Sequence, residues 1–130
     1  MTEYLQVRLV AADRQVWSGE AREVTARTTD GDIGILPGHA PLLGVLVNGA
    51  LRIRQGHGEH VDAAVLGGFL SVASNEVSIL AETAELAEEI DVDRARRALE
   101  EARRQVEGDE DALGAAERAE ARLRVAGVAL

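Results

Sequence analysis

The sequence has no cysteine and no lysine, and its only aromatic residues are Tyr4, Trp17 and Phe69. Without cysteine the chain forms no disulfide, no thiolate metal site and no cysteine nucleophile. Without lysine it cannot carry the lysine-ended glycine loop that cradles nucleotide phosphates. So few aromatic residues also exclude a surface built on base stacking. The sequence therefore lacks the usual signatures of several classes of enzymes and nucleic-acid-binding proteins.

Positive charge is scarce as well, because 14 arginines stand against 23 acidic residues and the net charge is −9. Such a surface repels a phosphate backbone, so we expect no nucleic-acid partner. No run approaches the roughly 20 apolar residues that cross a bilayer, so we expect no direct membrane insertion. Because the first residues also lack the basic-then-apolar layout of a secretory signal, we expect a soluble, intracellular protein. Apolar residues still make up 46% of the chain, which predicts a packed core.

Residues 1–86 have the pattern of short β-strands. Leu5, Val7 and Leu9 alternate with polar residues, which is the period of a half-buried strand, and Asp-Gly and Asn-Gly turns follow at hairpin spacing. We predict about eight to ten strands in an antiparallel β-sandwich or flattened barrel, because strands without intervening helices bury their apolar faces against each other. Gly67-Gly68, inside an apolar stretch, predicts a bend where another backbone comes close.

Residues 87–130 change to a helical pattern rich in Ala, Glu and Arg. Two apolar stripes predict an antiparallel hairpin of two helices of about 15 residues each, the first capped by Asp91 or Asp93. The stripes consist of Ala95, Ala98, Leu99, Ala102 and Val106, and of Leu113, Ala116, Ala119, Leu123 and Ala126. Because alanine buries little area, docking is expected to contribute on the order of a few kcal/mol. Composition leaves open whether the hairpin moves or stays permanently packed.

The histidines offer little basis for catalysis. His39 stands in a loop between Pro37 and Pro41, which favours a contact role. His57 and His60 lie in or beside a predicted turn without a third ligand nearby, so exposed turn residues are the favoured interpretation over a metal site. No serine or threonine occupies a nucleophile motif, so we expect neither catalytic residues nor a metal. An enzyme that uses His39 or His57 with a metal stays as a minor alternative.

Arginines in the helical region form a more informative pattern. Arg118 and Arg122 lie four positions apart on one face of the second predicted helix, and Arg94 in the first helix could approach them from the other side. Like charges at this spacing repel unless an anion lies across them. Asp91 could accept hydrogen bonds from a ribose or from amides. The anion is either a ligand phosphate or an intrahelical carboxylate, for which the candidates are Glu101, Glu117 and Glu120.

Four segments together resemble a known family. They are residues 31–42 (GDIGILPGHAPL), 67–72 (GGFLSV), 79–82 (ILAE) and 90–95 (IDVDRA). In this order and at these spacings, they resemble the epsilon subunit of the F-type, proton-translocating ATP synthase over essentially the whole chain. The resemblance implies a non-catalytic subunit of the central stalk that couples proton flow to ATP synthesis. It also implies a peripheral position at the cytoplasmic face of the cell membrane.

The resemblance assigns partners to both parts of the chain. The sandwich would grip the gamma subunit and touch the c-ring, while the hairpin could extend toward the alpha and beta subunits and suppress ATP hydrolysis. Asp32 resembles a c-ring contact, and His39, Leu42 and Leu43 resemble part of the gamma-facing surface. On that side we predict a partly exposed apolar patch, which consists of Leu42, Leu43, Val45 and Val47.

The resemblance also implies a regulatory ligand, although no cofactor is required. Asp91 and Arg94 match the family's ATP-binding signature, and Arg118 and Arg122 match the paired arginines that face the phosphates. Bound ATP would then favour the hairpin packed beside the sandwich. A free-standing ATP-sensing module, which uses the same four residues without a rotary partner, is the alternative.

Overall fold

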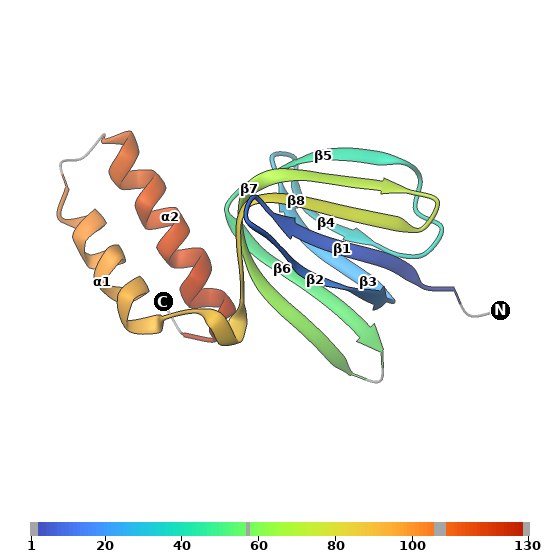
Figure 1. The fold of residues 1–130 in the computed structure, drawn as a ribbon. Helices are drawn as coiled ribbons and strands as arrows, with labels where there is room; N and C mark the ends of the chain where they lie inside the picture. Colours follow the sequence, from blue (N-terminus) through green and yellow to red (C-terminus); the bar gives the residue numbers. More distant parts are fainter. Residues whose placement is uncertain (1–2, 57, 106–108, 129–130) are drawn as a thin grey trace.

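The computed structural model describes residues 3–56, 58–105 and 109–128, which form strands followed by a helical hairpin (Figure 1). The strands are β1 (Leu5–Ala11), β2 (Arg14–Ala21), β3 (Glu23–Thr28), β4 (Gly31–Ile35), β5 (Leu42–Leu46), β6 (Gly49–Gly56), β7 (Glu59–Ala73) and β8 (Glu76–Leu86). The helical elements are a 3-10 turn η1 (Ala87–Glu89), α1 (Val92–Arg103) and α2 (Glu110–Val125). The predicted fold class, a β-sandwich followed by a two-helix hairpin, is confirmed.

The strands form one sheet that folds over on itself. Its order is β2-β1-β8-β7-β5-β3-β4, and β6 pairs with both β3 and β7. Strand β7 joins the two layers, because residues 59–65 pair with β6 while residues 68–72 pair with β5. The pairings are antiparallel except that between β1 and β8, which is parallel. These two strands come from opposite ends of the sandwich sequence, so a long crossover can join them in parallel.

The sandwich core consists of the inward-facing set of alternating side chains. In β1, Leu5, Val7 and Leu9 are buried while the residues between them are exposed. The largest fully buried side chains of the sandwich are Leu5, Leu9, Val24, Ile35, Leu51, Ile53, Leu70, Val72, Val77 and Ile79. Close packing of such branched side chains makes this part of the molecule hard to deform.

The predicted bend at Gly67-Gly68 is present in the middle of β7. Both glycines have positive φ, +74° and +115°. A Cβ atom on Gly68 would lie 2.0 Å from the carbonyl oxygen of Leu80 on β8, so no larger residue fits without parting the two strands. This close approach locks β7 to β8 where β7 changes its partner from β6 to β5.

The hairpin has a small core of its own. Ala95 and Leu99 of α1 pack against Ala119 and Leu123 of α2. Leu113, which the predicted stripe places in this seam, is instead 62% exposed, and in Figure 1 the first turns of α2 extend past the end of α1. The predicted seam residue Val106 lies outside the described residues. The buried seam is therefore shorter than the sequence pattern suggests.

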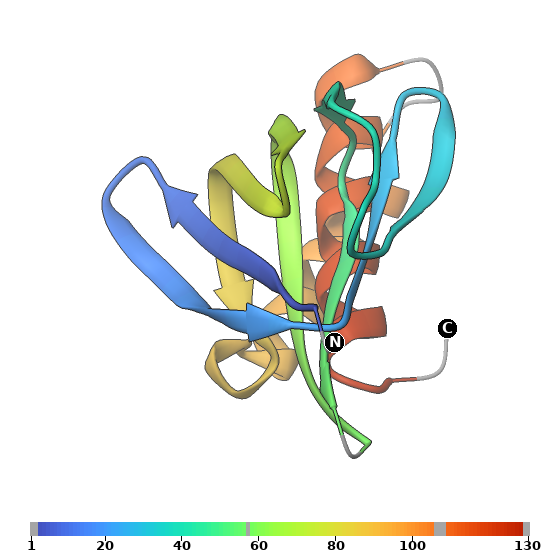
Figure 2. The same cartoon turned by 90° about the vertical axis from the view of Figure 1, so that its right-hand side faces the viewer.

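The hairpin docks on the sandwich through α2. Figure 1 shows α2 between α1 and the strands, and in Figure 2 the hairpin stands behind the strands, where α2 contacts β6 and β7. Ala121 and Val125 of α2 and Ala64 and Leu66 of β7 are buried, yet they belong to neither hydrophobic cluster, which fits a thin apolar layer at this contact. None of the helices in the described ranges combines the length and hydrophobicity that a membrane crossing requires.

Candidate functional site

A cleft of about 290 Å³ lies where the two helices meet the end of β8. Its lining consists of Glu85, Asp91, Arg94, Ala95, Ala98, Ala115, Arg118 and Arg122. The four residues that the sequence analysis singled out for ATP, which are separated by up to 31 positions, therefore line one cavity. Their charges sum to +2, because three arginines face one aspartate, and Glu85 reduces this sum to +1.

The N-terminus of α1 forms one wall of the cleft. Asp91 is the N-cap, and its Oδ1 accepts a hydrogen bond from the backbone N–H of Arg94 at 3.0 Å. Of the two predicted caps, Asp91 is therefore the one that caps the helix. The amide that donates to it belongs to the chain itself. The cap fixes the backbone of Arg94, so its exposed side chain starts from a set position at the rim of the cleft.

Helix α2 supplies the opposite wall with its two arginines. Gly114 makes room for Arg118, since a Cβ atom at Gly114 would lie 3.1 Å from Arg118 Nη1. Arg122 donates from Nε to a carboxylate oxygen of Glu85 on β8. The partner of Arg122 is thus a carboxylate of the sandwich and not an intrahelical one. Glu120, one of the intrahelical candidates, pairs with Arg103 at 4.0 Å and with Arg124 at 3.6 Å.

Glu85 is the residue of this cleft that sequence reasoning missed. It lies near the end of a strand, in a segment whose pattern indicates only alternation. Its partner Arg122 lies 37 positions away on the far helix of the hairpin. The one feature of the sequence that could have pointed to Glu85 is its position at the end of the β pattern, next to Leu86 and six positions before Asp91.

A second pair of charges fixes the segment between sandwich and hairpin. Arg14 of β2 donates from Nη2 to Oε1 of Glu89 at 2.8 Å, and the same oxygen accepts from the backbone N–H of Leu86 at 2.9 Å. The hydrogen bond from Arg14, and to a smaller extent the one from Leu86, lowers the pKa of Glu89 below its ordinary value. The turn η1 is therefore tied to the sandwich just before α1 begins.

An apolar row crosses the outer face of three strands on another side of the sandwich. Val45 of β5 pairs with Phe69 of β7, which pairs with Leu80 of β8, and the three side chains are 47%, 53% and 54% exposed. Val10 of β1 continues the row beside Leu80. These residues line a shallow hollow of about 520 Å³. Exposed apolar side chains gathered in this way are typical of a protein-binding surface.

The predicted gamma-facing residues divide between the two faces of β5. Leu43 is 74% exposed, whereas Leu42 packs against the sandwich core, because neighbouring strand residues point to opposite sides. Of the predicted apolar patch, Val45 is exposed and Val47 is half-buried. The predicted apolar patch on β5 is therefore partly exposed, as expected, and the exposed apolar surface continues across Phe69 and Leu80 of the neighbouring strands.

The loop that contains His39 is held from two sides. The backbone N–H of His39 donates to the carbonyl oxygen of Leu36 at 3.1 Å, and that of Gly38 donates to Asn75 Oδ1 at 2.7 Å. No group of metal-ligating side chains forms among residues 3–56, 58–105 and 109–128. His57, the other histidine considered for a metal, lies outside these ranges.

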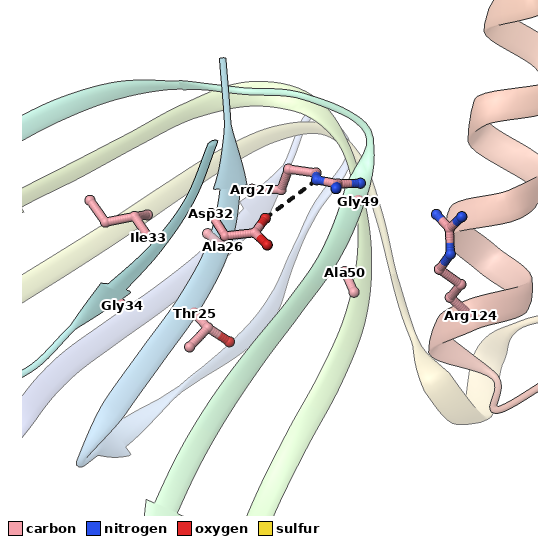
Figure 3. Close-up of a pocket in the computed structure, with 9 residues that line it drawn as sticks. All are labelled: Thr25, Ala26, Arg27, Asp32, Ile33, Gly34, Gly49, Ala50 and Arg124. Carbon is pink, nitrogen blue, oxygen red and sulfur yellow. Dashed lines mark ion pairs between the residues drawn. The ribbon is translucent and has the colours of Figure 1, made fainter. Parts of the chain in front are cut away.

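Asp32 lies on the edge strand β4, where its side chain is 78% exposed. Arg27 of β3, its cross-strand neighbour, pairs with it at 3.3 Å (Figure 3). The two residues line an open groove of about 670 Å³ that Arg124 of α2 borders from the hairpin side. Asp32 is thus accessible to a partner that approaches this edge of the sandwich.

Comparisons with known proteins agree with this architecture. The family model described as "ATP synthase, Delta/Epsilon chain, beta-sandwich domain" matches residues 4–87. The ATP synthase epsilon chain of Streptomyces avermitilis is 60% identical over 124 residues, with 95% of this chain and 96% of the relative covered. That of Thermobifida fusca is 50% identical over 129 residues, with 97% and 94% covered.

Solved structures extend the similarity to the whole fold. A chain in the cryo-EM structure of the Euglena gracilis mitochondrial ATP synthase (OSCP/F1/c-ring, rotational state 1) aligns with a TM-score of 0.74 at 27% identity. The alignment covers 94% of this chain and 76% of that one. A chain in the Tetrahymena thermophila mitochondrial ATP synthase shares the fold, with a TM-score of 0.57 at 20% identity. From its sandwich through its hairpin, this chain therefore belongs to the family of ATP synthase epsilon chains.

Proposed function

We propose that the chain is a non-catalytic rotor subunit that couples proton flow to ATP synthesis and uses its hairpin to restrain ATP hydrolysis. Family membership supports this proposal, as does the similarity to a chain in an F1/c-ring assembly. The observation that carries the regulatory part is the cleft, where Asp91, Arg94, Arg118 and Arg122 come together between the helices and the sandwich. Such a subunit is a peripheral part of the complex at the cytoplasmic face of the cell membrane.

The sandwich is the part that we assign to the rotor shaft. The row of Val45, Phe69 and Leu80 offers an apolar face on closely packed strands, and a stiff face of this kind transmits force without yielding. The gamma subunit is the proposed partner, with Leu43 and the loop of His39 beside the row. Asp32, on the edge strand, is the proposed contact with the c-ring.

The hairpin is the part that we assign to regulation. Its contact with the sandwich is a thin layer that includes the small side chains of Ala64 and Ala121, so docking is weak enough for a ligand to shift. Arginines from both helices converge on the cleft, and ATP phosphates bound there would tie α1 to α2 beside the sandwich. Extension of the undocked hairpin toward the alpha and beta subunits would then suppress hydrolysis.

Reconstitution with the alpha, beta and gamma subunits of the same synthase tests the rotor assignment. We expect the chain to bind the gamma-containing complex and to lower its ATP hydrolysis. A chain truncated after Leu86 is expected to keep binding and lose the inhibition, because residues 1–86 and 87–130 act as separate units. Absence of binding would refute the rotor role, and ATP binding without any gamma affinity would favour a free-standing ATP sensor.

A charge placed in the apolar row tests the shaft surface. Phe69→Glu is expected to weaken gamma binding by about 100-fold or more, because a carboxylate would be buried without a partner. Ser18→Glu is the matched control, since Ser18 is exposed on β2, outside the row. Equal binding by both variants would show that gamma contacts another face.

A further inference from the structure

We propose that Arg27 and Arg124 form an anion site of their own, which binds a phosphate group in the open groove between the sandwich and α2. The groove has a volume of about 670 Å³, and its lining comes from β3, β4 and β6 and from Arg124 of the hairpin (Figure 3). It shares no lining residue with the cleft to which we assign ATP. The inference therefore goes beyond the proposed function and does not depend on it.

Arg27 extends from β3 toward the hairpin because Gly49 of β6 makes room for it. A Cβ atom at Gly49 would lie 3.1 Å from Cβ and 3.2 Å from Cδ of Arg27, so the aliphatic part of Arg27 packs on the backbone of β6. Strand β6 is one of the strands that α2 contacts. Figure 3 shows the guanidinium group beside Gly49, turned toward the helix that carries Arg124. Two cations from different parts of the molecule therefore point into one groove.

The charges around the groove alternate in sign except at one step. On the sandwich side, Asp32 lies 3.3 Å from Nε of Arg27. On the hairpin side, Glu120 lies 3.6 Å from Nη2 of Arg124 and 4.0 Å from Nη2 of Arg103 on α1. Between these two groups, Arg27 and Arg124 line the same groove with like charges, which repel each other. A phosphate group between them would replace this repulsion with two attractions and complete the alternation.

Both arginines keep hydrogen-bond donors for a ligand. Their ion pairs, at 3.3 and 3.6 Å, are longer than the roughly 2.7–2.9 Å of a charge-assisted hydrogen bond. A guanidinium carries several N–H donors, more than one carboxylate at such a distance can use. The two side chains are 51% and 54% exposed, so a ligand reaches them from solvent. The site can therefore accept an anion without first breaking either ion pair.

The size of the groove defines the class of ligand. Its volume lies within the range of about 300–1,000 Å³ that is typical of ligand pockets, and it is larger than a phosphate ion needs. The phosphate group can therefore be a free ion or the headgroup of an anionic lipid. Both sources offer the same chemistry to a pair of guanidinium groups.

An anion held by both arginines would connect the sandwich to the hairpin. Arg27 belongs to β3, whereas Arg124 belongs to the last turn of α2. A ligand that contacts both binds the docked hairpin better than the undocked one, so it shifts the balance toward docking. Phosphate would thus stabilise the docked hairpin from a site outside the ATP cleft.

Calorimetric titration of the full chain with inorganic phosphate, in a buffer without other oxyanions, tests the site. We expect a dissociation constant on the order of 1 mM for the unmodified chain, and binding at least about tenfold weaker for Arg27→Gln and for Arg124→Gln. Arg54→Gln is the matched control, because Arg54 is 56% exposed and pairs with Glu23 at 3.5 Å but does not line the groove. We expect its affinity to stay within about twofold of the original.

Amide hydrogen exchange shows whether the anion bridges the two parts. With phosphate at about ten times its dissociation constant, amides of α2 that exchange through undocking should exchange about tenfold more slowly. Arg27→Gln should remove this gain although the change lies in the sandwich. A gain that persists in Arg27→Gln would mean that Arg124 holds the anion alone, and this would overturn the proposal.

Cosedimentation with vesicles distinguishes the two sources of the phosphate group. Binding to phosphatidylglycerol vesicles but not to phosphatidylcholine vesicles, lost in Arg27→Gln and Arg124→Gln, would identify a lipid headgroup, whereas binding of inorganic phosphate alone would identify the free ion. Absence of both kinds of binding, or equal binding by the Arg27, Arg124 and Arg54 variants, would refute the site. Phosphate binding that is lost in Arg118→Gln and kept in Arg27→Gln would place the anion in the ATP cleft and would also refute it.

Discussion

The sandwich and the hairpin are stabilised in different ways although they share one short chain. The sandwich has ten large branched side chains that are fully buried in a continuous core, and its strands are locked at Gly68 by direct backbone contact. The hairpin buries two alanines and two leucines in its own seam, and it reaches the sandwich through a thin layer and the Glu85–Arg122 pair. We therefore expect the sandwich to resist deformation and the hairpin to separate from it at a smaller cost in free energy.

This difference matches the two tasks that we propose. A body that follows a rotating shaft must resist deformation. A regulatory arm instead needs two states whose free energies differ by only about a few kcal/mol, so that the binding energy of a ligand can shift the balance between them. The hairpin helices have good local support from caps at Asp91 and Asp109, so they can remain helical when they leave the sandwich. Buried packing is therefore concentrated in the sandwich, and the proposed function requires docking of the hairpin to be adjustable.

The largest expected effect comes from Gly68→Ala. Its Cβ would lie 2.0 Å from the carbonyl oxygen of Leu80, so β7 and β8 must separate in addition to adopting an unfavourable φ. We expect the free energy of unfolding to fall by about 3 kcal/mol or more. The control is Gly31→Ala, with a similar φ of +111° and no atom within 4 Å of its Cβ, where about 1–3 kcal/mol is expected. Denaturant unfolding measures both, and equal losses would show that the close approach does not lock the sandwich.

The next effect separates the two cores directly. Leu9→Ala in the sandwich and Leu123→Ala in the hairpin remove the same atoms from buried positions, 0% and 1% exposed. Each change removes about 2–5 kcal/mol of packing energy at its own site. We expect Leu9→Ala to lower the free energy of unfolding of the whole chain, and Leu123→Ala to lower only the free energy of opening of the hairpin. Amide hydrogen exchange checks this, because Leu123→Ala should expose α1 and α2 and leave the strands protected. Loss of protection throughout the sandwich in Leu123→Ala would show that the two parts unfold together.

Local patterns predicted the fold better than they predicted the site. Alternation in segments such as Leu5–Leu9 fixes which face of a strand is buried, and helical spacing places Arg118 and Arg122 on one face, because both signals depend on near neighbours. The Glu85–Arg122 pair depends on how α2 docks against β6 and β7, which brings Arg122 to the end of β8, and no short-range pattern encodes this docking. Leu42 points inward because of its register with Val72 of β7, and this pairing is likewise set by tertiary structure.

A smaller effect is expected at the cap of α1. Asp91→Ala removes the acceptor for the N–H of Arg94, and loss of such a cap costs about 1 kcal/mol. The sandwich does not depend on this contact, so its strands should keep their protection while α1 becomes less protected in hydrogen exchange. Asp93→Ala is the control, since Asp93 is exposed in the same first turn but is not the cap. Equal loss of α1 protection in both variants would contradict the capping role.

The smallest effect concerns the tie between the two parts, and it depends on pH. The pKa of Glu89 is lowered in the folded chain, first by the hydrogen bond from Arg14 and then by that from Leu86, with Asp13 and Glu85 as further charges near Arg14. A lowered folded pKa means that the contribution is fully present above pH 4.5, the ordinary value, and is lost as the pH falls through the folded value. Unfolding of the unmodified chain and Glu89→Gln, followed from pH 7 to below 4, should therefore show a stability difference that shrinks with acidification, because a protonated Glu89 resembles glutamine. A difference that persists at low pH would mean that the Arg14 contact acts through packing, and the segment after β8 would then be held to the sandwich independently of charge.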